Sequence, residues 1–294
     1  MSEMTMSEIE VIGSPAAMSS WAEGQRARGR RIAFVPTMGA LHAGHVALLA
    51  AARGHGDVVA LSIFVNPIQF GAGEDLGRYP RDLEGDLGRA REAGVAVAFV
   101  PEAKDMYPAG YQTFVEVREV AAGLCGASRP DHFVGVASVV CKLFNIVRPH
   151  VALFGEKDFQ QLVVIRRMVA DLNLPVEVVG RPTMREPDGL AMSSRNRYLA
   201  PADRVRASAL YQGLCAARDC FSTGEHDAAA LLAAARAIIE PRVDGIDYLE
   251  IRDAEYLRPL ADVTSPALAL VAAFLGSTRL IDSMRLEGKS TGTG

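Results

Sequence analysis

Residues 32–52 of the chain have the sequence IAFVPTMGALHAGHVALLAAA. The first four residues are apolar and precede Pro36, which is typical of a short buried strand. A glycine-bearing turn follows, and from Val46 onward the alanines and leucines favour a helix. Residues 58–65 are again apolar and rich in β-branched side chains. Strand, loop, helix and strand within about 35 residues predict a βαβ unit, which crosses right-handedly into a parallel sheet.

The same alternation continues along the chain. Helical patterns cover residues 83–93, 136–147 and 159–172, and strand patterns cover residues 95–100, 151–154 and 176–179. This order predicts an α/β fold with a Rossmann-like doubly wound parallel sheet, whose ligands bind at the carboxyl ends of the strands.

The pattern changes after about Thr183. Residues 201–221 and 227–239 favour helices, whereas residues 246–251, 268–275 and 279–286 favour strands joined by short turns, hence antiparallel. We therefore predict a Rossmann-like domain over residues 1–184 and a smaller C-terminal α+β lid domain over residues 185–294. Residues up to about Pro15 are expected to be a mobile lead-in, and residues 288–294 are expected to be disordered.

Composition excludes several classes of protein. The 294 residues are 49% hydrophobic, enough for a core, and the net charge of −4 offers no general attraction for nucleic acid or an anionic membrane. The N-terminus has no apolar signal-peptide core, and no apolar run approaches the roughly 20 residues that span a bilayer. The four cysteines form no Cys-x-x-Cys pair, which favours reduced thiols in the cytoplasm.

A histidine pair follows the first predicted strand. Gly39 and Gly44 allow a tight turn, and His42 and His45 are three residues apart at the opening of the helix. A helix N-terminus favours an anion, and imidazole donors can follow the charge that develops on a phosphate. The alternative is that the histidines only cap the helix and face solvent. We favour the phosphate site, which is not a Walker A loop because no lysine follows the second glycine.

Two later segments also suit a nucleotide. Lys157 and Asp158 follow the strand at 151–154, where a lysine can meet a polyphosphate and a carboxylate can meet a ribose. Residues 192–196, Met-Ser-Ser-Arg-Asn, place two hydroxyls beside the guanidinium of Arg195. Alone, Lys157 would more often be a solvated surface residue, and Ser-Ser-Arg would be an ordinary loop. Both segments indicate a nucleotide site because they occur together with the histidine motif.

Several motifs occur in a fixed order along the chain. They are Val-Pro-Thr-Met-Gly-Ala-Leu-His-x-Gly-His, Phe-Val-Asn-Pro-x-Gln-Phe, Tyr-Pro-Arg, Phe-Gly-Glu-Lys-Asp-x-Gln-Gln and Met-Ser-Ser-Arg-Asn-Arg-Tyr-Leu. The first and last resemble the His-x-Gly-His and Lys-Met-Ser-Lys-Ser signatures of the nucleotidyltransferase superfamily. Together, and densely over residues 32–200, the set resembles the pantoate–β-alanine ligase family.

The resemblance implies an ATP-dependent ligase that forms pantothenate. Pantoate would attack the α-phosphate of ATP to give pantoyl adenylate and pyrophosphate, and the amine of β-alanine would then displace AMP. Mg²⁺ would accompany ATP, mainly through its phosphates, and a homodimer is implied. Catalytic roles would fall to His45, as proton donor, and to His42, Lys157 and Arg195.

The resemblance also assigns binding residues. The implied ATP-binding set is Met38, Gly39, His42, His45, Gly155, Lys157, Asp158, Met184, Met192, Ser193, Ser194 and Arg195. Gln69 and Gln161 would hold pantoate, with Pro36, Met38 and Phe64 as an apolar wall for its gem-dimethyl group. Arg129 and His132 correspond to a family segment near the site entrance.

The chain departs from the family at two places. Ala43 replaces a common acidic residue, and the carboxylates near the Tyr-Pro-Arg motif are sparser than in relatives. Asp86 is the expected protein ligand of the metal.

Two other functions compete with this interpretation. Another nucleotidyltransferase, such as a mononucleotide adenylyltransferase, would leave Gln69 and Gln161 unexplained. An aminoacyl-tRNA synthetase fragment would need a tRNA-binding surface, and the acidic charge balance and the short second domain argue against it. A catalytically dead binding protein would have little reason to keep both histidines, Lys157 and Arg195.

Overall fold

The computed structural model describes residues 8–264 and 266–287. The chain folds into two compact units, neither of which is continuous in sequence. Unit 1 comprises the residues up to Ala121 together with Arg129–Gly155 and Val164–Arg181. Unit 2 comprises Ala122–Ser128, Glu156–Val163 and the residues from Pro182 onward. The division at residues 184 and 185 stays a prediction.

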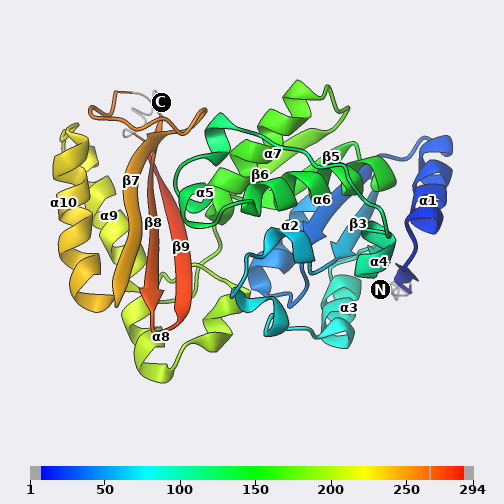
Figure 1. Cartoon of the computed structure of the whole chain (residues 1–294), viewed down its shortest axis with the longest axis horizontal. Coiled ribbons are helices and arrows are strands. Elements are labelled where there is room, and N and C mark those ends of the chain that lie inside the picture. The colour runs from blue at the N-terminus through cyan, green and yellow to red at the C-terminus, as the bar shows by residue number, and fades with distance from the viewer. Residues whose placement is uncertain (1–7, 265, 288–294) are drawn as a thin grey trace, which may run out of the picture. The chain divides into compact units, whose positions relative to one another are not determined.

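Unit 1, which runs from blue to green in Figure 1, contains a six-stranded parallel sheet with the order β1-β4-β3-β2-β5-β6. Its strands are β1 (Glu10–Ile12), β2 (Ile32–Thr37), β3 (Val58–Ile63), β4 (Val97–Phe99), β5 (Val151–Gly155) and β6 (Glu177–Arg181). Ile32 pairs with Val58 and the register continues to Thr37 with Ile63. The predicted Rossmann-like parallel sheet is therefore confirmed.

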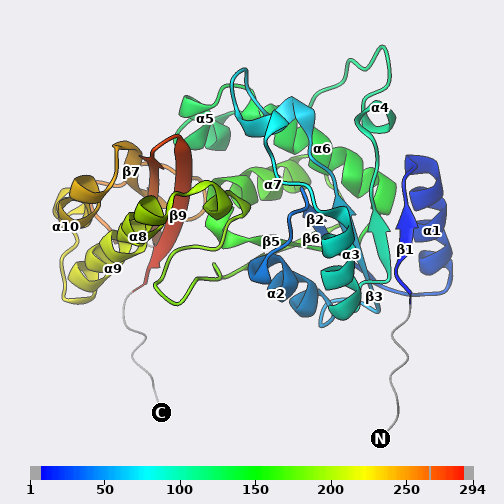
Figure 2. The same cartoon turned by 90° about the horizontal axis from the view of Figure 1, so that it is seen from below.

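Helices cover both faces of this sheet (Figure 2). They are α1 (Pro15–Ala27), α2 (Ala43–Ala52), α3 (Leu83–Glu92), α4 (Ala103–Met106), α6 (His132–Val147) and the part of α7 (Phe159–Asp171) that belongs to this unit. On the face of α2 and α3, Leu49 and Ala90 pack with Ala33, Val35 and Leu61. Because β2 is buried on both faces, its run of apolar residues is continuous rather than alternating.

Unit 2 contains an antiparallel sheet of three strands, β7 (Gly245–Asp253), β8 (Ala267–Leu275) and β9 (Thr278–Leu286). Helices α9 (Ala209–Ser222) and α10 (Ala228–Ile239) pack against it around a core that includes Leu214, Leu231 and Val271. The unit also holds α5 (Cys125–Ser128) and α8 (Pro201–Ala207). The predicted α+β character of this part is confirmed.

Three expectations from the sequence are corrected. The lead-in is ordered in part, because Glu10–Ile12 pairs in parallel with Val97–Phe99 as β1. Residues 201–221 form two helices that meet at Ser208, whose hydroxyl donates to the carbonyl of Val205. Helix α6 begins at His132, four residues before the predicted start. The tail at 288–294 lies outside the described residues.

Candidate functional site

The loop that follows β2 is held by a carboxylate from α3. Asp86 accepts hydrogen bonds from the backbone N–H groups of Ala40 and Leu41, both at 2.7 Å, and its side chain is buried. Gly39 and Ala40 have φ of 80° and 51°, in the left-handed region that favours glycine. Burial raises the pKa of Asp86, and the two N–H bonds oppose that rise. Asp86 therefore fixes the path of the loop that delivers the histidines.

Both predicted histidines use one ring nitrogen to begin α2. Nδ1 of His42 accepts from the N–H of Gly44 at 3.2 Å, and Nδ1 of His45 accepts from the N–H of His42 at 3.3 Å. The ring centroids are 4.0 Å apart. Since a backbone N–H can only donate, each Nδ1 is an acceptor, and the neutral rings carry their protons on Nε2. Capping therefore uses Nδ1 and makes Nε2 of each ring a donor at the start of a helix.

Gln69 lies in the short 3-10 helix η1 (Pro67–Gln69), just beyond the carboxyl end of β3. Its Oε1 accepts from Nδ2 of Asn66 at 3.0 Å, and its Nε2 contacts Sδ of Met38 at 3.0 Å. The structure thus brings Gln69 together with Met38 from the loop after β2, because β2 and β3 are neighbours in the sheet.

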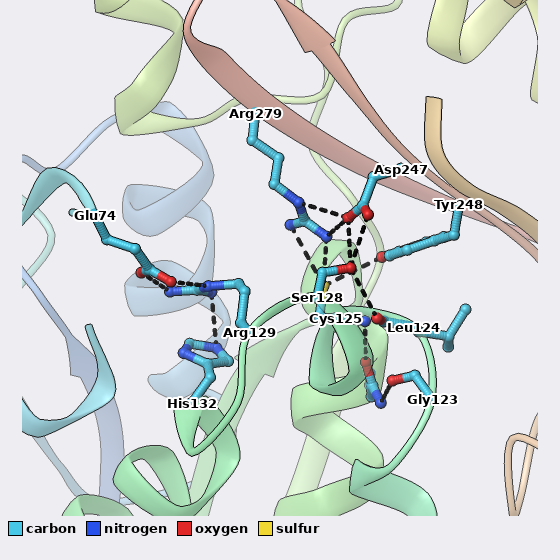
Figure 3. Close-up of polar contacts among 11 residues, drawn as sticks. Glu74, Gly123, Leu124, Cys125, Ser128, Arg129, His132, Asp247, Tyr248 and Arg279 are labelled. Carbon is cyan, nitrogen blue, oxygen red and sulfur yellow. Dashed lines mark hydrogen bonds and ion pairs between the residues drawn. The ribbon is translucent and has the colours of Figure 1, made fainter. Parts of the chain in front are cut away.

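Glu74, Arg129 and His132 form a polar triad (Figure 3), which holds the main chain of Gln69. Glu74 accepts from Nε and Nη2 of Arg129 at 2.9 and 2.5 Å, and Nη1 of Arg129 lies 3.0 Å from Nε2 of His132. Nδ1 of His132 lies 2.8 Å from the carbonyl oxygen of Gln69. Because a carbonyl only accepts, Nδ1 of His132 carries the proton and its Nε2 accepts from Arg129. Arg129 and His132 therefore support the Gln69 turn.

In unit 2, Lys157 lies in the 3-10 helix η4 (Glu156–Asp158), directly before α7. Its Nζ is 3.2 Å from the Asp158 carboxylate, and only 18% of its side chain is exposed. The preceding residue, Glu156, is anchored to β9, since its carboxylate accepts from Arg285 at 3.0 Å and its carbonyl accepts from Ser283 at 2.8 Å. Lys157 is thus a partly buried cation on a fixed turn.

The Ser-Ser-Arg segment packs against the same strand. Ser193 caps the 3-10 helix η5 (Ser194–Tyr198), because its hydroxyl accepts from the N–H of Arg195 at 3.3 Å. Both η4 and η5 pack against β9. The backbone N–H of Met192 donates to the carbonyl of Met184 at 2.9 Å, which joins the two predicted methionines.

A buried ion pair supports this loop. Arg185 donates to both carboxylate oxygens of Asp282 at 2.6 and 3.0 Å. Burial raises the pKa of Asp282, against the opposing effect of the Arg185 contacts and of Lys157 nearby. Arg185 therefore ties the start of the loop to β9.

A second polar network attaches Ala122–Ser128 to the three-stranded sheet of unit 2 (Figure 3). Asp247 accepts from Arg279 at 2.6 and 2.9 Å and from the hydroxyl of Ser128 at 2.8 Å. Sγ of the buried Cys125 lies 3.3 Å from the hydroxyl of Tyr248 and 3.5 Å from Nη2 of Arg279.

The buried Gln160 completes this attachment at the start of α7. Its Oε1 accepts from the N–H of Cys125 at 3.0 Å, and its Nε2 donates to the carbonyl of Gly123 at 2.7 Å. The half-buried Gln161 follows directly in the same helix.

The predicted residues therefore fall into two groups, one in each unit. Unit 1 holds Pro36, Met38, Gly39, His42, His45, Gln69, Asp86 and Gly155, and unit 2 holds Lys157, Asp158, Gln161, Met184, Met192, Ser193, Ser194 and Arg195.

Asn66, Glu74 and the loop-holding role of Asp86 were not predicted from the sequence. Asn66 stands inside the quoted Phe-Val-Asn-Pro motif, so that motif was the signal that could have found it.

Neither a metal cluster nor a membrane span was found in the part of the chain that the structure describes. Within residues 8–264 and 266–287, no three His, Cys, Asp or Glu side chains are grouped to hold a metal ion. Both carboxylate oxygens of Asp86 accept backbone N–H bonds from the loop after β2. Over the same residues, no helix is long and apolar enough to cross a membrane.

Comparison with known proteins points to one family. A family model described as pantoate-beta-alanine ligase matches residues 10–285. Pantothenate synthetase 1 of Bradyrhizobium diazoefficiens is 58% identical over 260 residues, covering 88% of this chain and 91% of that protein. The pantothenate synthetase of Myxococcus xanthus is 55% identical over 282 residues, covering 95% and 97%.

Solved structures agree with the sequence relatives. The crystal structure of pantothenate synthetase from Thermus thermophilus superposes with a TM-score of 0.90 at 46% identity, covering 95% of this chain and 99% of that one. The pantoate-beta-alanine ligase of Francisella tularensis, complexed with beta-gamma ATP and beta-alanine, gives a TM-score of 0.78 at 34% identity, covering 94% and 97%.

Proposed function

The chain belongs to the pantoate–β-alanine ligase family and is an ATP-dependent ligase that joins pantoate to β-alanine, and we propose that it does so through a pantoyl-adenylate intermediate. In the first step a carboxylate oxygen of pantoate attacks the α-phosphorus of ATP, and pyrophosphate leaves. In the second step the amine of β-alanine attacks the acyl carbon, AMP leaves and the amine loses a proton. The product is the amide pantothenate.

The observation that supports this chemistry best is the paired histidine cap of α2. Nδ1 of His42 and of His45 accepts from backbone N–H groups, so Nε2 of each neutral ring is a donor. Two donors at a helix N-terminus suit the phosphates of ATP, and they stabilise the charge that develops as pyrophosphate departs. We assign His45 as the proton donor and Met38 and Gly39 to the same nucleotide.

Unit 2 supplies the cationic half of the proposal. Lys157 and Arg195, with the hydroxyls of Ser193 and Ser194, would bind phosphate oxygens. The adenosine would be bound by Gly155, Asp158, Met184 and Met192. The anchoring of η4 and η5 to β9 supports these roles, because charges on fixed turns need little reorganisation during the reaction.

Pantoate would be held by neutral amides. Gln69 and Gln161 hydrogen-bond without adding charge near a carboxylate, and Pro36 and Met38 would face the gem-dimethyl group. The contact of Gln69 with Met38 at 3.0 Å supports placing the polar and apolar parts of this subsite side by side.

The remaining parts of the proposal rest on the family. Mg²⁺ would arrive with the phosphates of ATP, with Asp86 as its predicted protein ligand, although the N–H bonds at Asp86 favour a loop-holding role. A homodimer and a cytoplasmic location are likewise proposed, and nucleic acid and membranes are not expected as partners.

Two assays test the intermediate. With pantoate and without β-alanine, the enzyme should exchange labelled pyrophosphate into ATP, and AMP should be released only when both substrates are present. Folded enzyme that releases AMP with both substrates but shows no exchange would refute a pantoyl adenylate formed before β-alanine acts.

A pair of histidine variants separates capping from chemistry. Asparagine is a good N-cap, so His42→Asn should keep the start of α2 and the melting temperature while removing Nε2. His45→Ala should reduce turnover by about 100-fold or more, as expected for loss of an acid–base group. Turnover close to wild type in both variants would refute the assigned roles.

A further inference from the structure

The amide of Gln69 is oriented by a chain of hydrogen bonds that starts at Tyr107. Tyr107 directly follows α4, and its hydroxyl lies 2.7 Å from Oδ1 of Asn66. Nδ2 of Asn66 lies 3.0 Å from Oε1 of Gln69 and 3.1 Å from the carbonyl oxygen of Gly135 in α6. Asn66 is 1% exposed and Gln69 is 8% exposed, so these bonds form out of water.

The polarity of this chain is fixed by its chemistry. The carbonyl of Gly135 can only accept, so the atom of Asn66 that faces it is the amide nitrogen. The same nitrogen faces Gln69, which must therefore turn its oxygen toward Asn66. The oxygen of Asn66 faces Tyr107, whose hydroxyl must donate. No amide in the chain can be flipped without placing two donors or two acceptors against each other.

The surroundings keep Tyr107 a donor. Its ring lies 6.3 Å from that of Phe64 and 5.1 Å from that of Tyr111, and Nζ of Lys142 is 5.8 Å from its centroid. Burial, and to a lesser extent the neighbouring Tyr111, raises the pKa of the Tyr107 hydroxyl above its ordinary value, which favours the protonated form.

The consequence lies at the other end of the chain. With Oε1 of Gln69 committed to Asn66, its Nε2 faces the thioether of Met38, which is a weak acceptor. We infer that Tyr107 is a positioning residue that acts through Asn66 to make Gln69 a hydrogen-bond donor toward an oxygen acceptor of pantoate. This inference rests on the proposed binding of pantoate by Gln69.

Tyr107→Phe tests the inference, and Tyr111→Phe is its matched control. Tyr111 belongs to the same aromatic group, but its hydroxyl has no part in the chain to Gln69. In pyrophosphate exchange, Tyr107→Phe should raise the KM for pantoate by about tenfold, as expected for disrupting one buried hydrogen bond. The KM for ATP should stay within about twofold, and Tyr111→Phe should leave both constants within about twofold.

The side-chain amide signal of Gln69 gives a second readout by ¹⁵N–¹H NMR. It can be identified by its loss in the isosteric variant Gln69→Glu, and saturating pantoate should move it in wild-type protein more than in Tyr107→Phe.

Several results would overturn the inference. One is a KM for pantoate in Tyr107→Phe that stays within twofold of wild type. A second is a Gln69 amide signal that pantoate moves equally in wild type and Tyr107→Phe. A third is a Tyr107→Phe chain that fails to fold, since a positioning hydroxyl is dispensable for folding. Failure of the proposed function would look different, because the wild-type enzyme itself would then show no pantoate-dependent exchange.

Discussion

Gly135 is the position where a single added methyl group should weaken both the binding of pantoate and the stability of the fold. It lies in the first turns of α6, against η1. A Cβ at Gly135 would lie 2.5 Å from the carbonyl oxygen of Ile68 and 2.6 Å from Cα of Gln69. Both are backbone atoms, so no side-chain rotation can relieve the overlap. In Gly135→Ala, η1 must therefore move away from the helix.

The expected magnitude follows from two opposing effects. Alanine in a helix interior is favoured over glycine by about 1 kcal/mol. Forcing a methyl group into a packed contact costs about 1–3 kcal/mol. In the variant, the hydrogen bond from Asn66 to the carbonyl of Gly135 would be strained as well. We expect a net loss of about 1–2 kcal/mol, or roughly 2–8 °C in Tm. Because Gln69 moves with η1, the KM for pantoate should rise about tenfold or more.

Gly88→Ala is the matched control for this experiment. Gly88 also lies inside a helix, α3, but a Cβ there would have no heavy atom within 4 Å. This variant should be up to about 1 kcal/mol more stable than wild type, with an unchanged KM. Thermal unfolding and pyrophosphate exchange measure both quantities. If Gly135→Ala were as stable as Gly88→Ala and bound pantoate normally, the close contact of α6 with η1 would be refuted.

Three further substitutions each test a contact within one unit. In Asp86→Asn, an NH₂ group replaces one of the two carboxylate oxygens that accept loop N–H bonds. The free energy of unfolding should fall by about 1–3 kcal/mol, and turnover should fall as well; an unchanged Tm would contradict this. Glu74→Gln tests a carboxyl whose pKa burial would raise but which the hydrogen bond and charge of Arg129 hold below its ordinary value of 4.5. A carboxylate with a lowered pKa stabilises the fold above pH 4.5, and this stabilisation is lost as pH falls through the folded-state pKa. The Tm difference between Glu74→Gln and wild type should therefore be full at pH 7 and shrink below about pH 4.5. A constant difference down to pH 3 would rule this out. Asp247→Asn removes the carboxylate that pairs with Arg279, which should lower the free energy of unfolding by about 1–3 kcal/mol and speed deuterium exchange in residues 122–128. Exchange at the wild-type rate would show that Asp247 does not hold that segment.

The parallel sheet could be predicted because its signal is local. Four consecutive apolar residues before Pro36, followed by a glycine turn and a helix, are enough to indicate a buried parallel strand. The edge strand β1 has only three residues, and Val11 is 50% exposed, so its pattern was too short to detect. Helix α1 did carry a readable signal, since Ser14 caps it and Pro15 occupies its first position.

The supporting contacts of the site could not be predicted, because they join residues distant in sequence. Asp86 reaches the backbone of Ala40 across 46 residues, and Asn66 reaches Gly135 across 69. No periodicity or spacing reports such pairs. The histidines stood out because both fall in one helical turn, yet which of their nitrogens caps the helix required the structure.

The discontinuity of unit 2 sets an order on its assembly during protein synthesis. Ser128 emerges from the ribosome 119 residues before its partner Asp247, and Glu156 emerges 129 residues before Arg285. At bacterial or eukaryotic elongation rates of about 5–20 residues per second, Ser128 waits roughly 6–24 s. During that interval the thiol of Cys125 lacks Tyr248 and Arg279, the partners that later surround it. A nascent chain stalled before β7 should therefore expose this cysteine to alkylation, whereas the finished protein should protect it.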